Sequence, residues 1–241
     1  IAKAKIQLLN EVKPTGYVYV LKDDPILQKN LKKHLNTAGT VVNFPNPNFT
    51  NFETNIKTDA LKSNLAVAFQ IAVEQFSIDI DLITDKLKYI SPMKGRLNII
   101  DGINNLIIID DSYNISDMSL QNSIDYVKKR YGDKQKILVV GGIPGLAEKS
   151  VEVHTALASY FNVFEYVFLV GETAWQYNLE LAESKIMHFD TADDVGIYIK
   201  NNLDLTGNKV ILFKGGSDIK LENAISMLLK NEDDKTLLLS R

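Results

Sequence analysis

The sequence predicts an α/β fold with a mostly parallel sheet, and two observations support this. From Gly95 onward, apolar runs of strand length alternate with amphipathic helical segments, which is typical of strand–helix–strand units. A shorter strand–helix–strand pattern also lies near the beginning of the chain. The apolar runs are Leu106–Ile109, Ile137–Val140, Val167–Val170 and Val210–Phe213.

The first elements follow from apolar spacing and from turn residues. Apolar positions across Ile1–Val12 predict a short helix that ends at Pro14 and Gly16. A strand over Tyr17–Leu21, a helix over Ile26–Leu35 and a strand over 40–44 follow. The stretch Pro45–Asn55 contains two prolines and four asparagines, so we expect a loop.

Two helices precede the predicted domain boundary. Apolar residues from Leu61 to Ala72 recur at helical spacing, and a second helix spans about Asp81–Tyr89 and ends before Ser91-Pro92. The chain has 241 residues, enough for two modest domains. We therefore expect one unit over 1–92 and a second over 93–241.

In the second unit, a helix is expected after each apolar run. The helical patterns begin at Ser119, at about Lys149, at about Thr173 and at Thr191. Thr191 and Asp194 have the spacing of a capping box, in which the two side chains bond to free N–H groups at the helix start.

Composition excludes several classes of function. The chain has 45% hydrophobic residues, a net charge of −3 with scattered cations, and no cysteine. These features argue against nucleic-acid binding, disulfides and thiolate metal sites, and the lack of cysteine fits a cytoplasmic location. We also expect a monomer. No apolar run is long enough for membrane insertion. The chain begins with Ile1 and not with Met, so we expect that upstream sequence is missing.

Residues with ligand-binding chemistry follow the four apolar runs. They are Asp110-Asp111, Gly141-Gly142, Gly171-Glu172 and Lys214-Gly215-Gly216. In open parallel sheets the ligand crevice lies beyond the carboxyl ends of the strands, so we predict a small-molecule site there. Glycine permits close backbone approach, lysine can hold an anion, and aspartate can bind a hydroxyl, an ammonium group or a metal. The alternative is structural, because Gly and Asp also end strands and cap helices.

Two common signals are absent from the 241 residues. There is no Gly-x-x-x-x-Gly-Lys-Ser/Thr loop and no Gly-x-Gly-x-x-Gly, the usual phosphate-binding sequences. His34, His154 and His188 are not spaced as a metal-binding pair. His154 fits packing or a local hydrogen bond better than catalysis.

Several motifs carry a family resemblance. Lys94-Gly95-Arg96-Leu97, followed by Ile108–Asn114 (IIDDSYN), resembles the Mur ligases, which are ATP-dependent ligases of cell-wall synthesis. The resemblance continues through Glu148-Lys149-Ser150 with His154 and through Lys214-Gly215. It implies that 1–92 is the end of the central ATPase domain of such an enzyme. It also implies that 93–241 is the Rossmann-like C-terminal domain.

The resemblance also implies an activity. ATP would phosphorylate a carboxylate, and an amine would attack the acyl phosphate, with Mg²⁺ among the cofactors. Within the family, the motifs fit best the members that join D-alanyl-D-alanine to UDP-N-acetylmuramoyl-tripeptide. Because no phosphate loop is visible, we expect the 241 residues alone to lack turnover.

The resemblance assigns roles to individual residues. Lys5 lies where many members carry a carbamylated lysine that helps to hold Mg²⁺; the alternative is a solvated helix lysine. The expected ATP-binding residues are Arg96, Asp111, Tyr113 and Asn114, and the expected substrate-binding residues are Ser119, His154, Lys214 and Gly215.

The chain also departs from the family pattern. Asp59–Asn64 replaces the usual His-Asn pair and second Asn at the adenine side, Ile115-Ser116-Asp117 replaces Ala-Asn-Pro, and Gly216-Ser217 replaces Ser-Arg. The turn at Gly141-Gly142 lacks the customary aspartate. Loss of the arginine removes a bidentate carboxylate binder, a role that could pass to Lys214. A degenerate Mur-like binding module and a related amide ligase, such as a folylpolyglutamate- or cyanophycin-type enzyme, therefore remain alternatives.

Overall fold

The computed structural model describes residues 7–34, 40–44, 49–56, 58–177 and 185–240. It divides the chain into two compact units, Ile1–Ser91 and Pro92–Arg241. Lys5 and the start of the helix predicted over Ile1–Val12 lie outside the described residues.

The first unit begins with the predicted strand–helix–strand pattern. A 3-10 helix, η1 (Gln7–Glu11), comes first. The strands β1 (Tyr17–Leu21) and β2 (Thr40–Phe44) then pair in parallel, and α2 (Pro25–His34) lies between them in the chain. Two further helices, α3 (Asp59–Phe76) and α4 (Ile80–Leu87), follow as predicted. The Thr58 hydroxyl caps the N-terminus of α3, and the Asp79 carboxylate caps that of α4, which explains where both helices begin.

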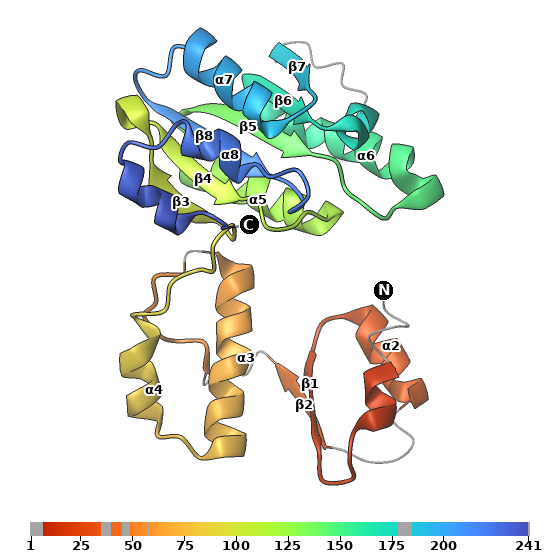
Figure 1. The fold of residues 1–241 in the computed structure, drawn as a ribbon. Coiled ribbons are helices and arrows are strands. Elements are labelled where there is room, and N and C mark those ends of the chain that lie inside the picture. Colours follow the sequence, from red (N-terminus) through yellow and green to blue (C-terminus); the bar gives the residue numbers. More distant parts are fainter. Residues whose placement is uncertain (1–6, 35–39, 45–48, 57, 178–184, 241) are drawn as a thin grey trace. The chain divides into compact units, whose positions relative to one another are not determined.

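The second unit contains a six-stranded sheet in the order β3-β4-β8-β5-β6-β7 (Figure 1). Among the strands that the structure describes in this sheet, only the β3–β4 pair is antiparallel, so the predicted mostly parallel sheet is confirmed. β3 and β7 were not predicted from the sequence. The strands are β3 (Asn98–Asp101), β4 (Ile107–Asp111), β5 (Gln135–Gly141), β6 (Tyr166–Val170), β7 (Lys185–Phe189) and β8 (Lys209–Lys214).

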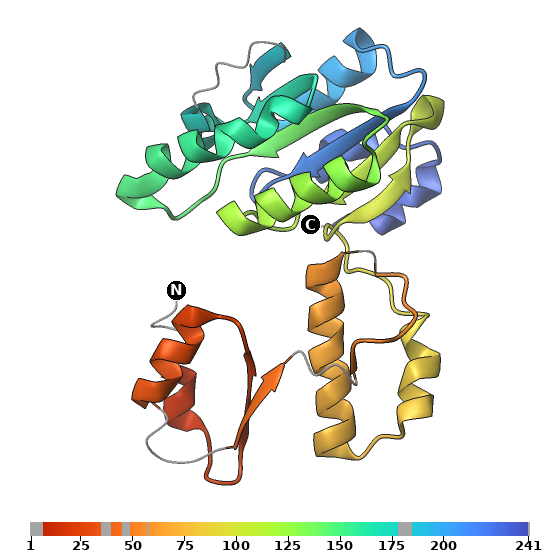
Figure 2. The same cartoon turned by 180° about the vertical axis from the view of Figure 1, so that it is seen from behind.

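Helices cover both faces of this sheet. Figure 1 shows α7 (Ala192–Asn202) and α8 (Glu222–Ser226) over one face, and Figure 2 shows α5 (Asp117–Arg130) and α6 (Ser150–Ala158) over the other. Alternate residues of each central strand therefore enter different cores: Ile108 packs on the α7–α8 side, and Ile109 on the α5–α6 side. Burial on both faces explains why the central strands are continuously apolar.

Helix starts agree with the sequence in three places and differ in one. α5 begins at Asp117, where Ser116 and Ser119 form a capping box; α6 begins at Ser150; and Thr191 caps α7. The Thr191 cap accepts from the Asp194 N–H, while the Asp194 carboxylate accepts from the Thr191 hydroxyl. After Thr173 the described residues form a 3-10 helix, η6 (Glu172–Tyr177), in place of the predicted α-helix.

The strand order creates a switch point near the middle of the sheet. The chain runs from β5 through β6 to the edge strand β7, and it then returns by α7 to place β8 between β4 and β5. In sheets of this kind, the crevice at such a reversal is the usual ligand position. The carboxyl ends of β4, β8 and β5 are therefore the part of the unit to search for a site.

Candidate functional site

The structure brings together the strand-end residues of β4, β8 and β5. Asp111 pairs in register with Lys214, and Lys214 pairs with Val140. A Cβ added at Gly141 would lie 3.6 Å from the Gly215 Cα, so these two backbones also lie close together. The sheet edge thus holds two carboxylates, a lysine and several glycines, as the sequence predicts.

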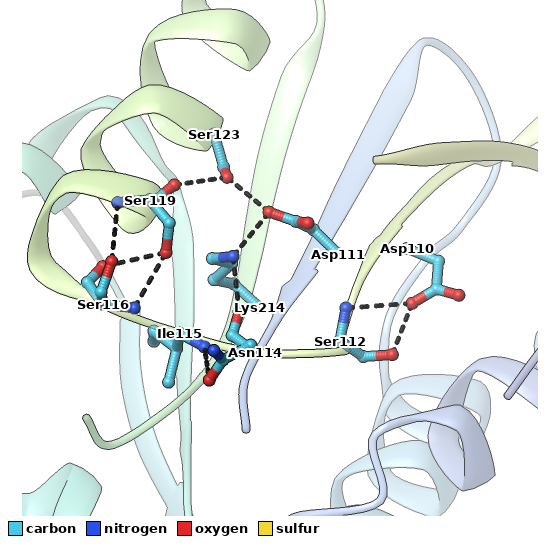
Figure 3. Close-up of polar contacts among 9 residues, drawn as sticks. All are labelled: Asp110, Asp111, Ser112, Asn114, Ile115, Ser116, Ser119, Ser123 and Lys214. Atoms are coloured by element: carbon cyan, nitrogen blue, oxygen red, sulfur yellow. Dashed lines mark hydrogen bonds and ion pairs between the residues drawn. The ribbon is translucent and has the colours of Figure 1, made fainter. Parts of the chain in front are cut away.

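A buried ion pair links β8 to β4. Lys214 Nζ lies 2.8 Å from Asp111 Oδ2, and it also donates to the Asn114 carbonyl oxygen at 2.7 Å (Figure 3). Asp111 Oδ2 accepts a second hydrogen bond from Ser123 Oγ at 2.6 Å, and its carboxylate accepts another from the Leu97 backbone N–H. Lys214 is 2% exposed. Its ammonium group is therefore engaged inside the protein.

Burial opposes the charged forms of this pair. Desolvation raises the pKa of Asp111 and lowers the pKa of Lys214. The mutual attraction of the two charges, with the hydrogen bond between them, acts in the opposite direction on both groups. Each group therefore supplies the counter-charge that favours the ionised form of the other.

Asp110 points to the opposite side from Asp111. Its Oδ1 accepts from Ser112 Oγ at 2.6 Å and from Ser112 N at 3.2 Å (Figure 3). Its Oδ2 is buried and has no hydrogen-bond partner among the described residues. Burial is the main cause that raises the pKa of the Asp110 carboxyl, and the neighbouring Asp111 and Glu222 carboxylates raise it further.

The accessible part of the edge is formed by Arg96, Tyr113 and Asn114. The Arg96 guanidinium carbon lies 4.3 Å from the centre of the Tyr113 ring, and Tyr113 is 40% exposed. The Tyr113 N–H donates to the Gly95 carbonyl oxygen at 3.0 Å, which fixes the segment that carries Arg96 against the end of β4. A cation stacked on an aromatic ring is thus presented at this edge, and the exposed Asn114 follows the ring in the chain.

Ser119 lies at the start of α5 and serves the helix. Its Oγ accepts from the Ser116 N–H at 2.8 Å, and its own N–H donates to Ser116 Oγ at 3.2 Å (Figure 3). These are the reciprocal bonds of a capping box. The substrate role assigned to Ser119 remains a prediction beside this structural one.

His154 lies in the interior, fully buried on α6. Its Nε2 accepts from the Ile143 N–H at 2.8 Å, and its Nδ1 lies 2.6 Å from the Ser150 carbonyl oxygen. Both ring nitrogens are therefore used by the backbone, and the ring packs edge-on against Tyr177. This geometry fits a residue that positions the loop after β5.

The glycines at this edge are packed against the protein. A Cβ at Gly142 would lie 2.6 Å from the Thr173 Cβ, and a Cβ at Gly215 would lie 2.8 Å from Leu221 Cδ1. Both positions exclude a side chain because of internal packing, so their presence at the strand ends does not require a ligand.

Ser123 is the member of this network that sequence analysis missed. It lies on the buried face of α5, between the apolar residues Leu120, Ile124 and Val127. A polar residue within an apolar helical stripe needs a hydrogen-bond partner, and that pattern is the signal that could have identified it.

Within the described ranges, there is no group of three or more His, Cys, Asp or Glu side chains that could hold a metal ion. In the same part of the chain, every helix is too short or too polar to span a bilayer.

Comparison with known proteins gives consistent matches. The family model described as Mur ligase, glutamate ligase domain, matches residues 95–216. A UDP-N-acetylmuramoyl-tripeptide–D-alanyl-D-alanine ligase of Haemophilus influenzae is 33% identical over 144 residues, which cover 57% of this chain and 30% of the relative. The ligase of that name from Buchnera aphidicola (Acyrthosiphon pisum) is 24% identical over 98% of this chain and 56% of its own length.

Solved structures share the fold. The MurF ligase of Thermotoga maritima, in complex with ADP, superposes with a TM-score of 0.75 at 18% identity, over 97% of this chain and 56% of that one. The chain thus spans about half the length of the relatives that it matches from end to end.

Proposed function

Because the chain belongs to the Mur ligase family, we propose that it is part of an ATP-dependent ligase that joins D-alanyl-D-alanine to UDP-N-acetylmuramoyl-tripeptide in peptidoglycan synthesis. In this proposal, residues 1–92 form the end of a central ATPase domain and 93–241 form the C-terminal domain. The activity for which both relatives are named supports this choice of substrates. The enzyme would act in the cytoplasm.

The observation that carries the proposal is the Arg96–Tyr113–Asn114 group at the end of β4. Arg96 carries a permanent charge and a planar set of donors that suits phosphate oxygens. The exposed Tyr113 ring lies against it, and the exposed Asn114 follows in the chain, at the edge where open α/β sheets bind ligands. We assign these three residues to ATP. Asp111 is buried and acts through Lys214, which binds both the Asp111 carboxylate and the Asn114 carbonyl oxygen.

Magnesium is part of the proposed reaction, since charge must be neutralised at the migrating phosphoryl group. The described residues contain no acidic or histidine cluster that fits it. The carbamylated-lysine role of Lys5 therefore stays a proposal that depends on residues outside the described ranges.

The proposal predicts ATP-dependent phosphate release by the full gene product that contains these 241 residues. Release should require both UDP-N-acetylmuramoyl-tripeptide and D-alanyl-D-alanine, because the amine attacks the acyl carbon of the acyl phosphate, an amide bond forms and phosphate leaves. A coupled phosphate assay that omits each substrate in turn measures this requirement. The 241 residues alone should show no release, since the phosphate-binding loop is not among them.

The other outcomes separate the alternatives. A folded full-length protein that binds ADP but releases no phosphate contradicts the ligase proposal and favours a binding module. Release that requires a different amine or acid favours a related amide ligase.

Arg96→Ala should raise the KM for ATP in this assay by about tenfold or more. A charge-assisted hydrogen bond contributes roughly 1.5–3 kcal/mol, and about 1.4 kcal/mol corresponds to a factor of ten. Arg130→Ala, which removes an exposed arginine at the end of α5, is the matched control and should leave KM unchanged. Equal KM values in the two variants contradict the assignment of Arg96 to the phosphates.

A further inference from the structure

The loop that carries Tyr113 and Asn114 is held by a buried network that sequence motifs do not reveal. Asp111 receives one donor from each of three separate segments: Lys214 from β8, Ser123 from α5, and the Leu97 N–H from the segment before β3. A carboxylate held from three separate segments is restrained, and this restrains the end of β4 that carries it.

Lys214 extends this network into the loop itself. The same ammonium that pairs with Asp111 donates to the Asn114 carbonyl oxygen at 2.7 Å. It therefore joins the last residue of β4 to the loop beyond Tyr113. With 2% of its surface exposed and two contacts already made, Lys214 is poorly placed to bind a substrate directly.

Ser123 completes the arrangement from the opposite side. Its Oγ lies 2.6 Å from Asp111 Oδ2 and 2.7 Å from the Ser119 carbonyl oxygen. One hydroxyl proton can serve only one acceptor at a time, and the charged carboxylate is the stronger acceptor. The hydroxyl thus holds the carboxylate oxygen on which Lys214 also depends.

We propose that Lys214 and Ser123 are positioning residues for nucleotide binding, which hold Asp111 and the Asn114 backbone so that Tyr113 and Asn114 face the ligand. This inference rests on the proposed nucleotide role of the β4 end. It assigns to Lys214 an internal function in place of contact with the amine substrate, and it adds Ser123, whose hydroxyl is buried against Asp111 and the Ser119 carbonyl oxygen.

The test is Ser123→Ala in the full gene product, with Ser226→Ala as the matched control. Ser226 Oγ also bonds to a helix carbonyl, that of Asn223 at 2.7 Å, but on α8 and outside the network. Each variant loses one hydroxyl and keeps its helix. We expect Ser123→Ala to raise the KM for ATP and the Kd for ADP by about threefold to tenfold, with kcat within about twofold. Ser226→Ala should change neither.

Amide hydrogen exchange supplies a readout that does not depend on turnover. The amides of Ser112–Ser116 should exchange faster in Ser123→Ala than in the wild type, while Ser226→Ala should leave them unchanged. If both variants keep wild-type KM, Kd and exchange, the positioning role is wrong although the ligase proposal stands. If the wild-type protein binds no ADP, both proposals fail.

Discussion

Replacing Lys214 with methionine is expected to lower the free energy of unfolding of the Pro92–Arg241 unit by about 3–5 kcal/mol. Methionine fills the apolar stem of the lysine but leaves the Asp111 carboxylate buried without its counter-charge. The Asn114 carbonyl oxygen also loses its donor. For a unit of this size, the melting temperature should fall by roughly 6–20 °C, measurable by circular dichroism.

A double replacement tests whether the loss of stability comes from the unpaired Asp111 carboxylate. Lys214→Met combined with Asp111→Asn removes both charges, and it should recover much of the loss, because neutral groups of similar shape often replace a buried pair at little cost. Lys230→Met, at an exposed lysine, is the control and should change the melting temperature little. If Lys214→Met melts like Lys230→Met, the ion pair contributes nothing to stability.

The sequence predicts the centre of the sheet well and its edges poorly. β4, β5, β6 and β8 are buried on both faces, so each is a continuous apolar run that can be recognised locally. β3 and β7 lie at the two edges, where their exposed residues interrupt the apolar pattern. Their strand conformation depends on partners far away in the chain, and local spacing does not report such partners.

The chemistry of the site could be predicted only as residue types at strand ends. Topology places Asp111, Lys214 and Gly141 together, and the sheet rule anticipates this. Whether a lysine faces a ligand or a carboxylate depends on where its side chain points, and on which residue the neighbouring strand places there. That neighbouring strand can be distant in sequence. The family resemblance assigns Lys214 to the substrate, whereas in the structure its ammonium group contacts the Asp111 carboxylate and the Asn114 carbonyl oxygen. For His154, contact with the Ile143 N–H depends in the same way on how α6 packs.

Asp110→Asn is expected to make the second unit more stable at neutral pH, by roughly 1–3 kcal/mol. Burial, with the nearby Asp111 and Glu222 carboxylates, raises the pKa of the Asp110 carboxyl above its unfolded value. The folded state therefore holds this proton more tightly than the unfolded chain does. The contribution of the protonated Asp110 carboxyl to the free energy of unfolding is complete below the unfolded pKa of about 3.9. It is lost as pH rises through the folded pKa.

The difference between variant and wild type should therefore depend on pH. Urea unfolding between about pH 4 and pH 8 should show Asp110→Asn gaining on the wild type as pH rises, because asparagine keeps the acceptor for Ser112 without the buried charge. Asp101→Asn, at an exposed carboxylate on the adjacent strand β3, should show no such trend. A constant difference across this range would mean that Asp110 is ionised at no cost. A difference that grows with pH would instead identify Asp110 as a destabilising carboxylate beside the proposed nucleotide edge, and such groups concentrate at functional sites.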